Sequence, residues 1–132
     1  EDRIQSAVNE YAEFYGLGSV KIGNVWSNIQ HSGSCLNEHT HPNSIISGAL
    51  YINVDETCKL YFHNPNPYNG FTHYDKMNDF NYQFVWINVK NCQLILFPSW
   101  LKHGKNNEIN MMDDRVVVSF NCNYDNKDLI KI

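Results

Sequence analysis

The sequence lacks a cluster of basic residues, and it lacks any long apolar run. Its ten Lys and Arg residues are scattered along 132 residues and are outnumbered by fourteen Asp and Glu, which leaves a formal net charge of -4. Proteins that bind nucleic acid need a basic patch to hold the phosphates, so we expect no nucleic-acid partner. No apolar segment approaches the roughly 20 residues that cross a bilayer, so we expect no membrane partner either.

The sequence also lacks the cysteine spacing of a disulfide framework. Its four cysteines are far apart and form no C-x-x-C pair. A secretion signal begins with a positively charged segment followed by an apolar one, and the first residues of this sequence do not have this pattern. Both absences predict reduced thiols and a soluble, cytoplasmic protein. The chain begins with Glu1 instead of Met, which leaves open whether an upstream segment precedes it.

The sequence does contain one helical pattern, followed by many short strand patterns. Residues 2–15 place apolar side chains on one helical stripe, formed by Ile4, Val8, Tyr11 and Tyr15, and the glycines at 16 and 18 predict where the helix ends. Segments rich in β-branched and aromatic residues then follow at 20–26, 44–54, 58–64, 82–89, 93–100 and 115–124. So many short strands predict a single, mostly β domain over residues 1–132, an antiparallel sandwich or barrel such as the jelly roll, with an N-terminal helix.

The longest irregular stretch, residues 64–82, is rich in aromatic side chains and too long for a simple hairpin. Loops of this length often close over active sites. We therefore predict that it forms a lid over a substrate.

Three histidines have the spacing of a metal site. His39 and His41 are two residues apart, so they point to the same side if the segment is extended, and Pro42 favours that conformation at His41. His103 follows the apolar strand 93–100 and lies where it can reach the same point. Neutral imidazoles that converge in this way bind metals. The alternative for His39 and His41 is a pair of surface histidines in a turn.

An arginine at the head of an apolar strand predicts a carboxylate-binding group. Strand alternation places Arg115, Val117, Ser119 and Asn121 on one face of the segment 115–124. A planar guanidinium binds a carboxylate through two parallel hydrogen bonds, which an ammonium cannot do. The alternative is an edge-strand arginine that faces solvent.

The strand pattern 44–54 has a second face of small and polar residues. Alternation places on this face Ser47, Ala49, Tyr51 and Asn53. Together with the histidines and Arg115, this face predicts a cavity that has a metal at one end and a carboxylate clamp deeper inside.

Four motifs in order resemble those of the iron(II)- and 2-oxoglutarate-dependent oxygenases of double-stranded β-helix fold, most closely their short members. The motifs are W-x-N, H-x-HP-x-S-x-x-SG-x-x-Y, FPSWLxH, and R followed by SFN, found here at Trp26–Asn28, His39–Tyr51, Phe97–His103, and Arg115 with 119–121. The resemblance covers about residues 24–124. It implies the double-stranded β-helix, or jelly-roll, fold.

The resemblance also implies roles for particular residues. His39 would be the first iron(II) ligand and His103 the distal one, while Arg115 would pair with the far carboxylate of 2-oxoglutarate. The other residues implied for the cosubstrate pocket are Tyr51, whose hydroxyl would assist Arg115, Ser119 and Asn121. The implied reaction uses O2 and 2-oxoglutarate to hydroxylate a C–H bond of an unknown substrate, either a protein side chain or a small molecule, with release of succinate and CO2.

One departure from the oxygenase pattern leaves alternatives open. The family's usual motif is H-x-D or H-x-E, whereas here the third position is His41. We predict that His41 is itself a ligand beside His39 and His103. A cupin-type metalloprotein that does not use 2-oxoglutarate would also match His39-x-His41 and the spacing from Pro98 through His103 to Asn107, although the glutamate of the cupin motif is missing. A non-catalytic metal- or ligand-binding module is the third alternative.

Overall fold

The computed structural model describes residues 2–35, 39–104 and 109–125. Asn107, which belongs to the cupin-like spacing, lies outside these ranges. The elements follow the chain in the order α1 (Asp2–Phe14), β1 (Val20–Gln30), β2 (Ile46–Asn53), β3 (Lys59–His63), the 3-10 helix η1 (Pro67–Phe71), β4 (Phe84–Asn88), β5 (Leu94–Pro98), β6 (His103–Gly104) and β7 (Arg115–Tyr124).

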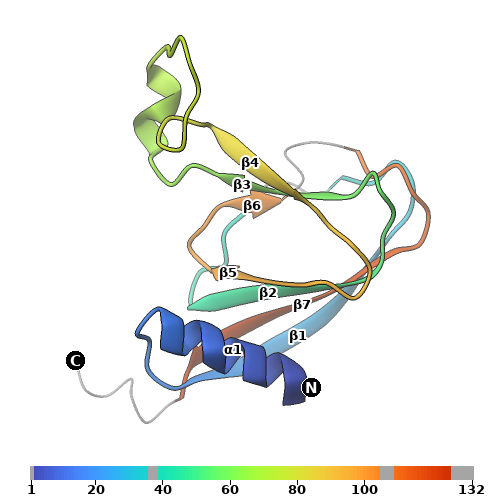
Figure 1. Cartoon of the computed structure of the whole chain (residues 1–132). Coiled ribbons are helices and arrows are strands. Elements are labelled where there is room, and N and C mark those ends of the chain that lie inside the picture. Colours follow the sequence, from blue (N-terminus) through green and yellow to red (C-terminus); the bar gives the residue numbers. More distant parts are fainter. Residues whose placement is uncertain (1, 36–38, 105–108, 126–132) are drawn as a thin grey trace.

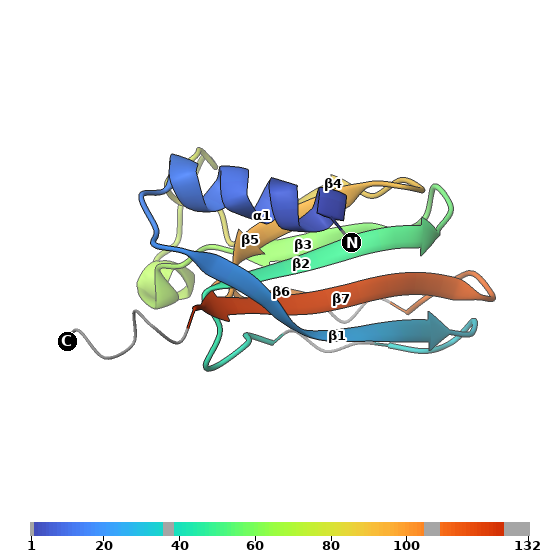
Figure 2. The same ribbon diagram turned by 90° about the horizontal axis from the view of Figure 1, so that it is seen from below.

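The strands form two antiparallel sheets that face each other (Figure 1). One sheet has the strand order β1-β7-β2-β5, and the other has the order β4-β3-β6. The helix α1 lies over the outer face of the four-stranded sheet (Figure 2). This arrangement is a jelly-roll-like sandwich with an N-terminal helix, and it confirms the predicted fold class.

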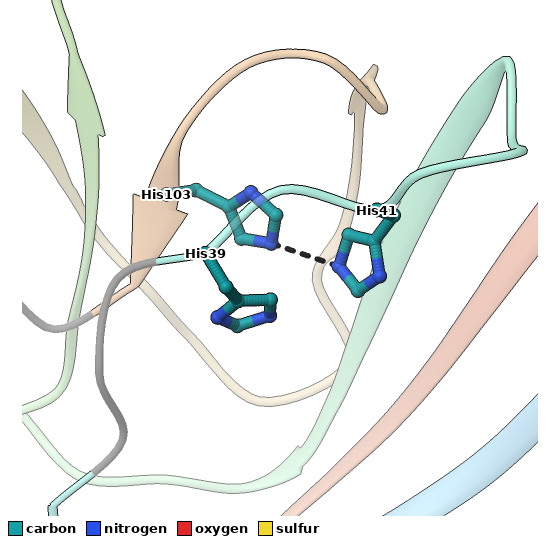
Figure 3. A group of neighbouring side chains, drawn as sticks. All are labelled: His39, His41 and His103. Carbon is teal, nitrogen blue, oxygen red and sulfur yellow. Dashed lines mark hydrogen bonds between the residues drawn. The ribbon is translucent and has the colours of Figure 1, made fainter.

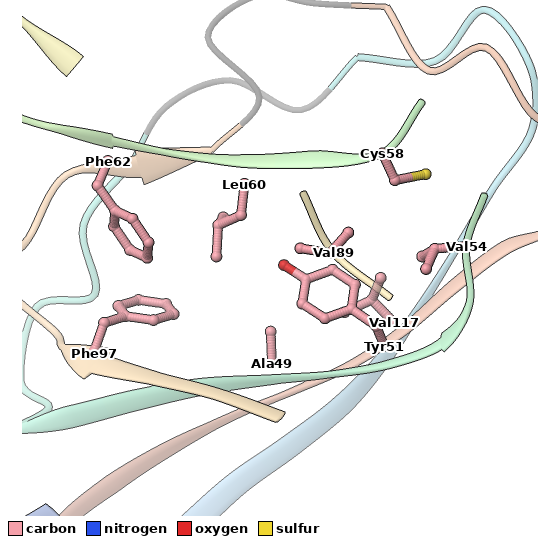
Figure 4. Close-up of a cluster of buried hydrophobic side chains, with 9 residues drawn as sticks. All are labelled: Ala49, Tyr51, Val54, Cys58, Leu60, Phe62, Val89, Phe97 and Val117. Atoms are coloured by element: carbon pink, nitrogen blue, oxygen red, sulfur yellow. The ribbon is translucent and has the colours of Figure 1, made fainter. Parts of the chain in front are cut away.

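Alternation along β2 and β7 supplies two separate hydrophobic cores. The inner face of the large sheet packs Ala49, Tyr51 and Val117 against the small sheet (Figure 4). The outer face packs Ile46 and Phe120 against α1. Because successive side chains point to opposite faces, each strand contributes to both cores.

Most predicted strands lie close to the observed ones, but two strands differ. Strand β1 continues to Gln30, four residues past the predicted end at Trp26, because it pairs with β7 along its whole length after a register shift between Ile22 and Val25. Strand β6 has only two residues and was not predicted. Its pairing partners are distant in sequence, and so short a segment carries no periodicity of its own.

The helix α1 ends where the glycines predict. Gly16 has a φ of 68°, in the left-handed region, and the Leu17 N–H donates to the Ala12 carbonyl at 2.8 Å. This is a Schellman-type end, which needs a residue that tolerates positive φ.

The stretch 64–82 projects beyond β3 and β4 (Figure 1) and is held by asparagine side chains. The amide of the buried Asn69 donates to the carbonyls of Asn81 and Tyr82, each at 2.7 Å, and Asn64 donates to Tyr82 at 2.8 Å. The stretch contains no strand, so these bonds from side chains to backbone carbonyls give it its shape.

No helix in the described part of the chain is long and apolar enough to cross a membrane. The cysteines are free thiols: Cys58 and Cys122 are buried, and Cys35 and Cys92 are exposed.

Gly48 generates a prediction about stability. A Cβ atom at this position would lie 2.2 Å from Cζ of Phe120, whose ring packs over the glycine. Gly48→Ala should therefore lower the free energy of unfolding by about 1–3 kcal/mol through overpacking. Urea denaturation measures this change, and Gly70→Ala is the control because no atom lies within 4 Å of the added Cβ. Equal stability of the two variants would contradict the prediction.

Candidate metal site and the cavity beside it

Backbone hydrogen bonds bring the three histidines together from two distant segments. The His39 N–H donates to the His103 carbonyl at 2.9 Å, and the His103 N–H donates to the His39 carbonyl at 3.1 Å. Two residues along, the His41 N–H donates to the Ser99 carbonyl at 3.0 Å. The segment from His39 to His41 therefore runs as an extended chain beside 99–103. This is the conformation that the H-x-H-P pattern predicts.

The three imidazoles point toward one another (Figure 3). One nitrogen from each of His39, His41 and His103 lies within 4.8 Å of the others, and Nε2 of His41 is 3.0 Å from Nε2 of His103. His103 is 5% exposed, and the other two are half-buried. A divalent ion bonds imidazole nitrogen at about 2.1 Å, so small side-chain movements allow one ion to contact all three rings.

A carbonyl group orients the His103 ring. Nδ1 of His103 lies 2.8 Å from the Leu101 carbonyl oxygen, which can only accept a hydrogen bond, so Nδ1 carries the proton. The lone pair of the neutral ring is then on Nε2, which faces His41. Hydrogen bonds of this kind fix the tautomer of histidines that bind metals.

Burial keeps two of the three imidazoles, those of His41 and His103, neutral. The pKa of His103 is lowered to about 4, mainly by desolvation and in smaller part by the nearby His39 and His41, although the hydrogen bond with the Leu101 carbonyl opposes the decrease. Desolvation, together with His39, also lowers the pKa of His41. Both rings are therefore neutral near pH 7, and neutral imidazole is the form that binds metals.

A cavity of about 120 Å³ extends from the histidines into the space between the sheets. The side chains that line it include His39, His41, His103, Trp26, Asn28, Gln30, Tyr51, Phe97, Arg115, Val117 and Ser119. The ring centroid of Phe97 is 4.4 Å from that of His103, whereas Tyr51 and Val117 lie at the other end of the core (Figure 4).

Arg115 is buried at the end of the cavity near Tyr51. It is 6% exposed, its Nη1 donates to Oε1 of Gln30 at 3.0 Å, and its Cζ is 5.8 Å from the centre of the Tyr51 ring. The buried Nε has no hydrogen-bond partner among the described residues. This burial rules out the solvent-exposed alternative. A buried guanidinium with an unsatisfied N–H is costly unless an anion completes its hydrogen bonds.

Tyr51 offers a neutral hydroxyl at the same end. It is 2% exposed, and burial raises its pKa to about 12 although the charge of Arg115 opposes the increase. The hydroxyl therefore keeps its proton at pH 7 and can act as a donor to a ligand.

The remaining predicted pocket residues separate in the structure. Ser119 lines the cavity, where it accepts a hydrogen bond from the amide of Asn28 at 3.3 Å. Asn121 is not among the lining residues in the described part of the chain, and its Oδ1 accepts from the Ser47 hydroxyl at 2.8 Å. The serine therefore remains a candidate ligand contact, and the asparagine belongs to a different hydrogen-bond network.

Sequence reasoning missed Gln30. It was overlooked because β1 was predicted to end at Trp26, whereas the strand continues and places Trp26, Asn28 and Gln30 on the face toward the cavity. The W-x-N pattern extends by one more alternation to glutamine, and that signal could have found it.

A second cavity of about 500 Å³ lies beside the stretch 64–82. It is lined by residues of that stretch together with His63, Gln83, Phe84, Trp100 and Lys102. No described residue of 64–82 lines the cavity that contains the histidines. Closure of this stretch over a substrate thus stays a prediction.

Comparison with known proteins supplies one match. A family model described as "Putative 2OG-Fe(II) oxygenase" matches residues 24–121, which include the three histidines, Tyr51, Arg115 and Ser119. Comparison with the curated proteins gives no significant match.

The low pKa of His103 predicts how stability depends on pH when a chelator removes metal. Between pH 4 and the ordinary pKa of 6.5, the unfolded chain binds a proton at His103 that the folded protein does not. The free energy of unfolding should therefore fall as pH is lowered through this window, by at most about 1.4 kcal/mol per pH unit.

Urea denaturation at several pH values, compared between the parent and His103→Gln, isolates this contribution. The variant should show a flatter profile from pH 6.5 to 4. His73→Gln is the control, because the His73 side chain is 94% exposed. Parallel profiles for the parent and His103→Gln would show that His103 is not neutralised by burial.

Proposed function

The chain belongs to the 2OG-Fe(II) oxygenase family, and we propose that it is an iron(II)- and 2-oxoglutarate-dependent oxygenase that hydroxylates a C–H bond of a protein side chain or a small molecule. The observation that carries this proposal is a single cavity with three converging histidines at one end and the buried, incompletely bonded Arg115 at the other. A molecule that has a metal-binding group and a distant carboxylate fits both ends.

The donor set of His39, His41 and His103 fits iron(II). The three nitrogens are close enough for one ion, and imidazole is a common ligand of divalent iron. Iron supplies the activation of O2, which side chains cannot perform. In this proposal His41 takes the place of the family's usual carboxylate.

The charge balance supports a dianionic cosubstrate. Three neutral histidines contribute no negative charge to the metal, unlike a set that contains a carboxylate. Arg115 adds one positive charge at the far end, which is desolvated and therefore interacts strongly with an anion. These charges favour 2-oxoglutarate, which carries a carboxylate at each end.

The far carboxylate would meet donors from two neighbouring strands of the large sheet, β7 and β2. Arg115 offers its unsatisfied Nε, Tyr51 offers a hydroxyl, and Ser119 lies on the same wall. Gln30 already accepts from Nη1 of Arg115, which orients the guanidinium without adding charge. Charge-assisted bonds from a planar fork hold the ligand in a single orientation, and the apolar walls formed by Phe97 and Val117 exclude water.

The neutral ligand set also favours a second candidate. A three-histidine metalloprotein of cupin type, or a module that binds metal without catalysis, would share His39, His41 and His103. Such a protein would bind iron(II) but would not convert 2-oxoglutarate to succinate. The presence of Arg115 and Tyr51 in the same cavity is what favours the oxygenase.

The main test is succinate release from 2-oxoglutarate with iron(II) and O2, with and without a panel of candidate peptides, amino acids and metabolites. The parent should release succinate, and His39→Ala or His103→Ala should abolish this release because each removes a ligand. Metal binding without any turnover would favour the second candidate.

The role of His41 is tested by two substitutions. If His41 is a ligand, His41→Ala should lower iron(II) affinity strongly, whereas His41→Asp should retain iron(II) because it restores two histidines and one carboxylate. Calorimetric titration measures both affinities. Equal affinity in the parent and His41→Ala would show that His41 is not a ligand.

The carboxylate clamp is tested by changing its charge and its shape. Arg115→Lys should weaken 2-oxoglutarate binding by about 2–3 kcal/mol, because an ammonium cannot make the paired bonds. Gln30→Glu should also weaken binding, because an isosteric carboxylate would neutralise Arg115 and repel the ligand. Neither substitution should alter iron(II) affinity.

Gln83→Glu is the matched control, since it adds the same charge at an exposed position outside this cavity. Titration of 2-oxoglutarate into the iron-loaded protein provides the readout. If Arg115→Lys binds 2-oxoglutarate as tightly as the parent does, the clamp is wrongly assigned.

A further inference from the structure

We propose that three polar residues, the buried Ser47 and Ser99 and the half-buried Asn121, form a positioning network that holds two of the histidines in place for metal binding. This inference rests on the metal site of the proposed function. It concerns residues that belong to the sequence motifs but do not line the cavity in the described part of the chain.

The network joins three elements by short hydrogen bonds. Ser47 on β2 and Asn121 on β7 are paired residues of the large sheet, and Ser99 follows β5. The two serine hydroxyl oxygens are 2.8 Å apart, and the Ser47 hydroxyl donates to Oδ1 of Asn121 at 2.8 Å. Because Ser47 uses its only proton on Asn121, the Ser99 hydroxyl must donate to Ser47.

The Ser47 and Ser99 side chains are both shielded from water. Ser99 is 0% exposed and Ser47 is 1% exposed. A buried hydroxyl without a hydrogen-bond partner costs free energy, because it has lost its bonds to water and gained none in return. The network therefore stabilises the arrangement of Ser99 in which both hydroxyls are bonded.

Ser99 belongs to a turn that holds two histidines at once. The Leu101 N–H donates to the Pro98 carbonyl at 3.0 Å, which closes the turn. The Ser99 carbonyl accepts from the backbone N–H of His41 at 3.0 Å, and the Leu101 carbonyl accepts from Nδ1 of His103 at 2.8 Å. The turn thus places the His41 backbone and orients the His103 ring. The Nε2 atoms of these two histidines face each other in Figure 3.

The side chain of Ser99 ties this turn to the large sheet. The Ser99 N–H donates to the Ile45 carbonyl at 3.1 Å, and the hydroxyl adds the second attachment through Ser47. With the hydroxyl removed, the turn can shift relative to β2 and β7, and both histidines shift with it. Ser47, Ser99 and Asn121 therefore act through other residues and are not themselves ligands.

Cobalt(II) titration followed by absorption spectroscopy tests this role, because the visible spectrum of the ion reports the geometry of its ligands. Ser99→Ala should weaken cobalt(II) binding by about 10–100-fold, which is typical when a group behind a metal ligand is removed. The visible bands should also change in position or intensity. Ser47→Ala should act in the same direction, and it provides a second variant if Ser99→Ala does not fold.

Ile46→Val is the matched control. Ile46 is next to Ser47, is 0% exposed and packs against the helix side of the sheet, so its truncation lowers stability without touching the network. This variant should bind cobalt(II) with the parent affinity and spectrum. If Ile46→Val weakens cobalt(II) binding as much as Ser99→Ala does, general destabilisation explains the effect and the inference is overturned.

Two further outcomes separate this inference from the proposed function. A parent protein that binds no cobalt(II) would overturn the metal site, and the positioning role with it. A parent that binds cobalt(II), together with folded Ser99→Ala and Ser47→Ala variants of unchanged affinity and spectrum, would overturn the positioning role alone.

Discussion

The pair of backbone hydrogen bonds between His39 and His103 is the contact on which the candidate site depends. Each residue donates to the other, so the two backbones are held at a fixed separation and in a fixed register. The register determines that both side chains point to the same side, and it brings His41 opposite Ser99.

The interior of the sandwich contains two kinds of polar group: imidazoles that can bind a cation, and a guanidinium that can bind an anion. His41 and His103 are neutral because burial disfavours their charged forms, as their lowered pKa values indicate. Among the described residues, the guanidinium of Arg115 has Gln30 as its one hydrogen-bonding side-chain partner, and its Nε has none. A metal cation at one end and a carboxylate at the other would satisfy both, which connects the electrostatics of the fold to the proposed chemistry.

Strand alternation predicted a large part of this interior, because it depends only on local backbone geometry. The face of Arg115, Val117 and Ser119 points inward as expected, and Tyr51, which pairs with Val117 from the neighbouring strand β2, lies on the same inner face. Alternation could not predict how far β1 extends, so it missed Gln30. Nor could it distinguish an inward residue that lines the cavity from one that is covered by a neighbour, which is why Asn121 was expected in the pocket.

By itself, the sequence determined the fold class, the helix and its end at Gly16, and the inward faces of β2 and β7, because these follow from periodicity and local conformational preference. It also placed His39 and His41 on one side of an extended segment. Only the tertiary structure decided that His103 joins them, that Ser99 and Leu101 hold them, and that Arg115 is buried beside Tyr51. These relations depend on hydrogen bonds and register between segments distant in sequence, and no local pattern of residues encodes which distant strand will be the neighbour.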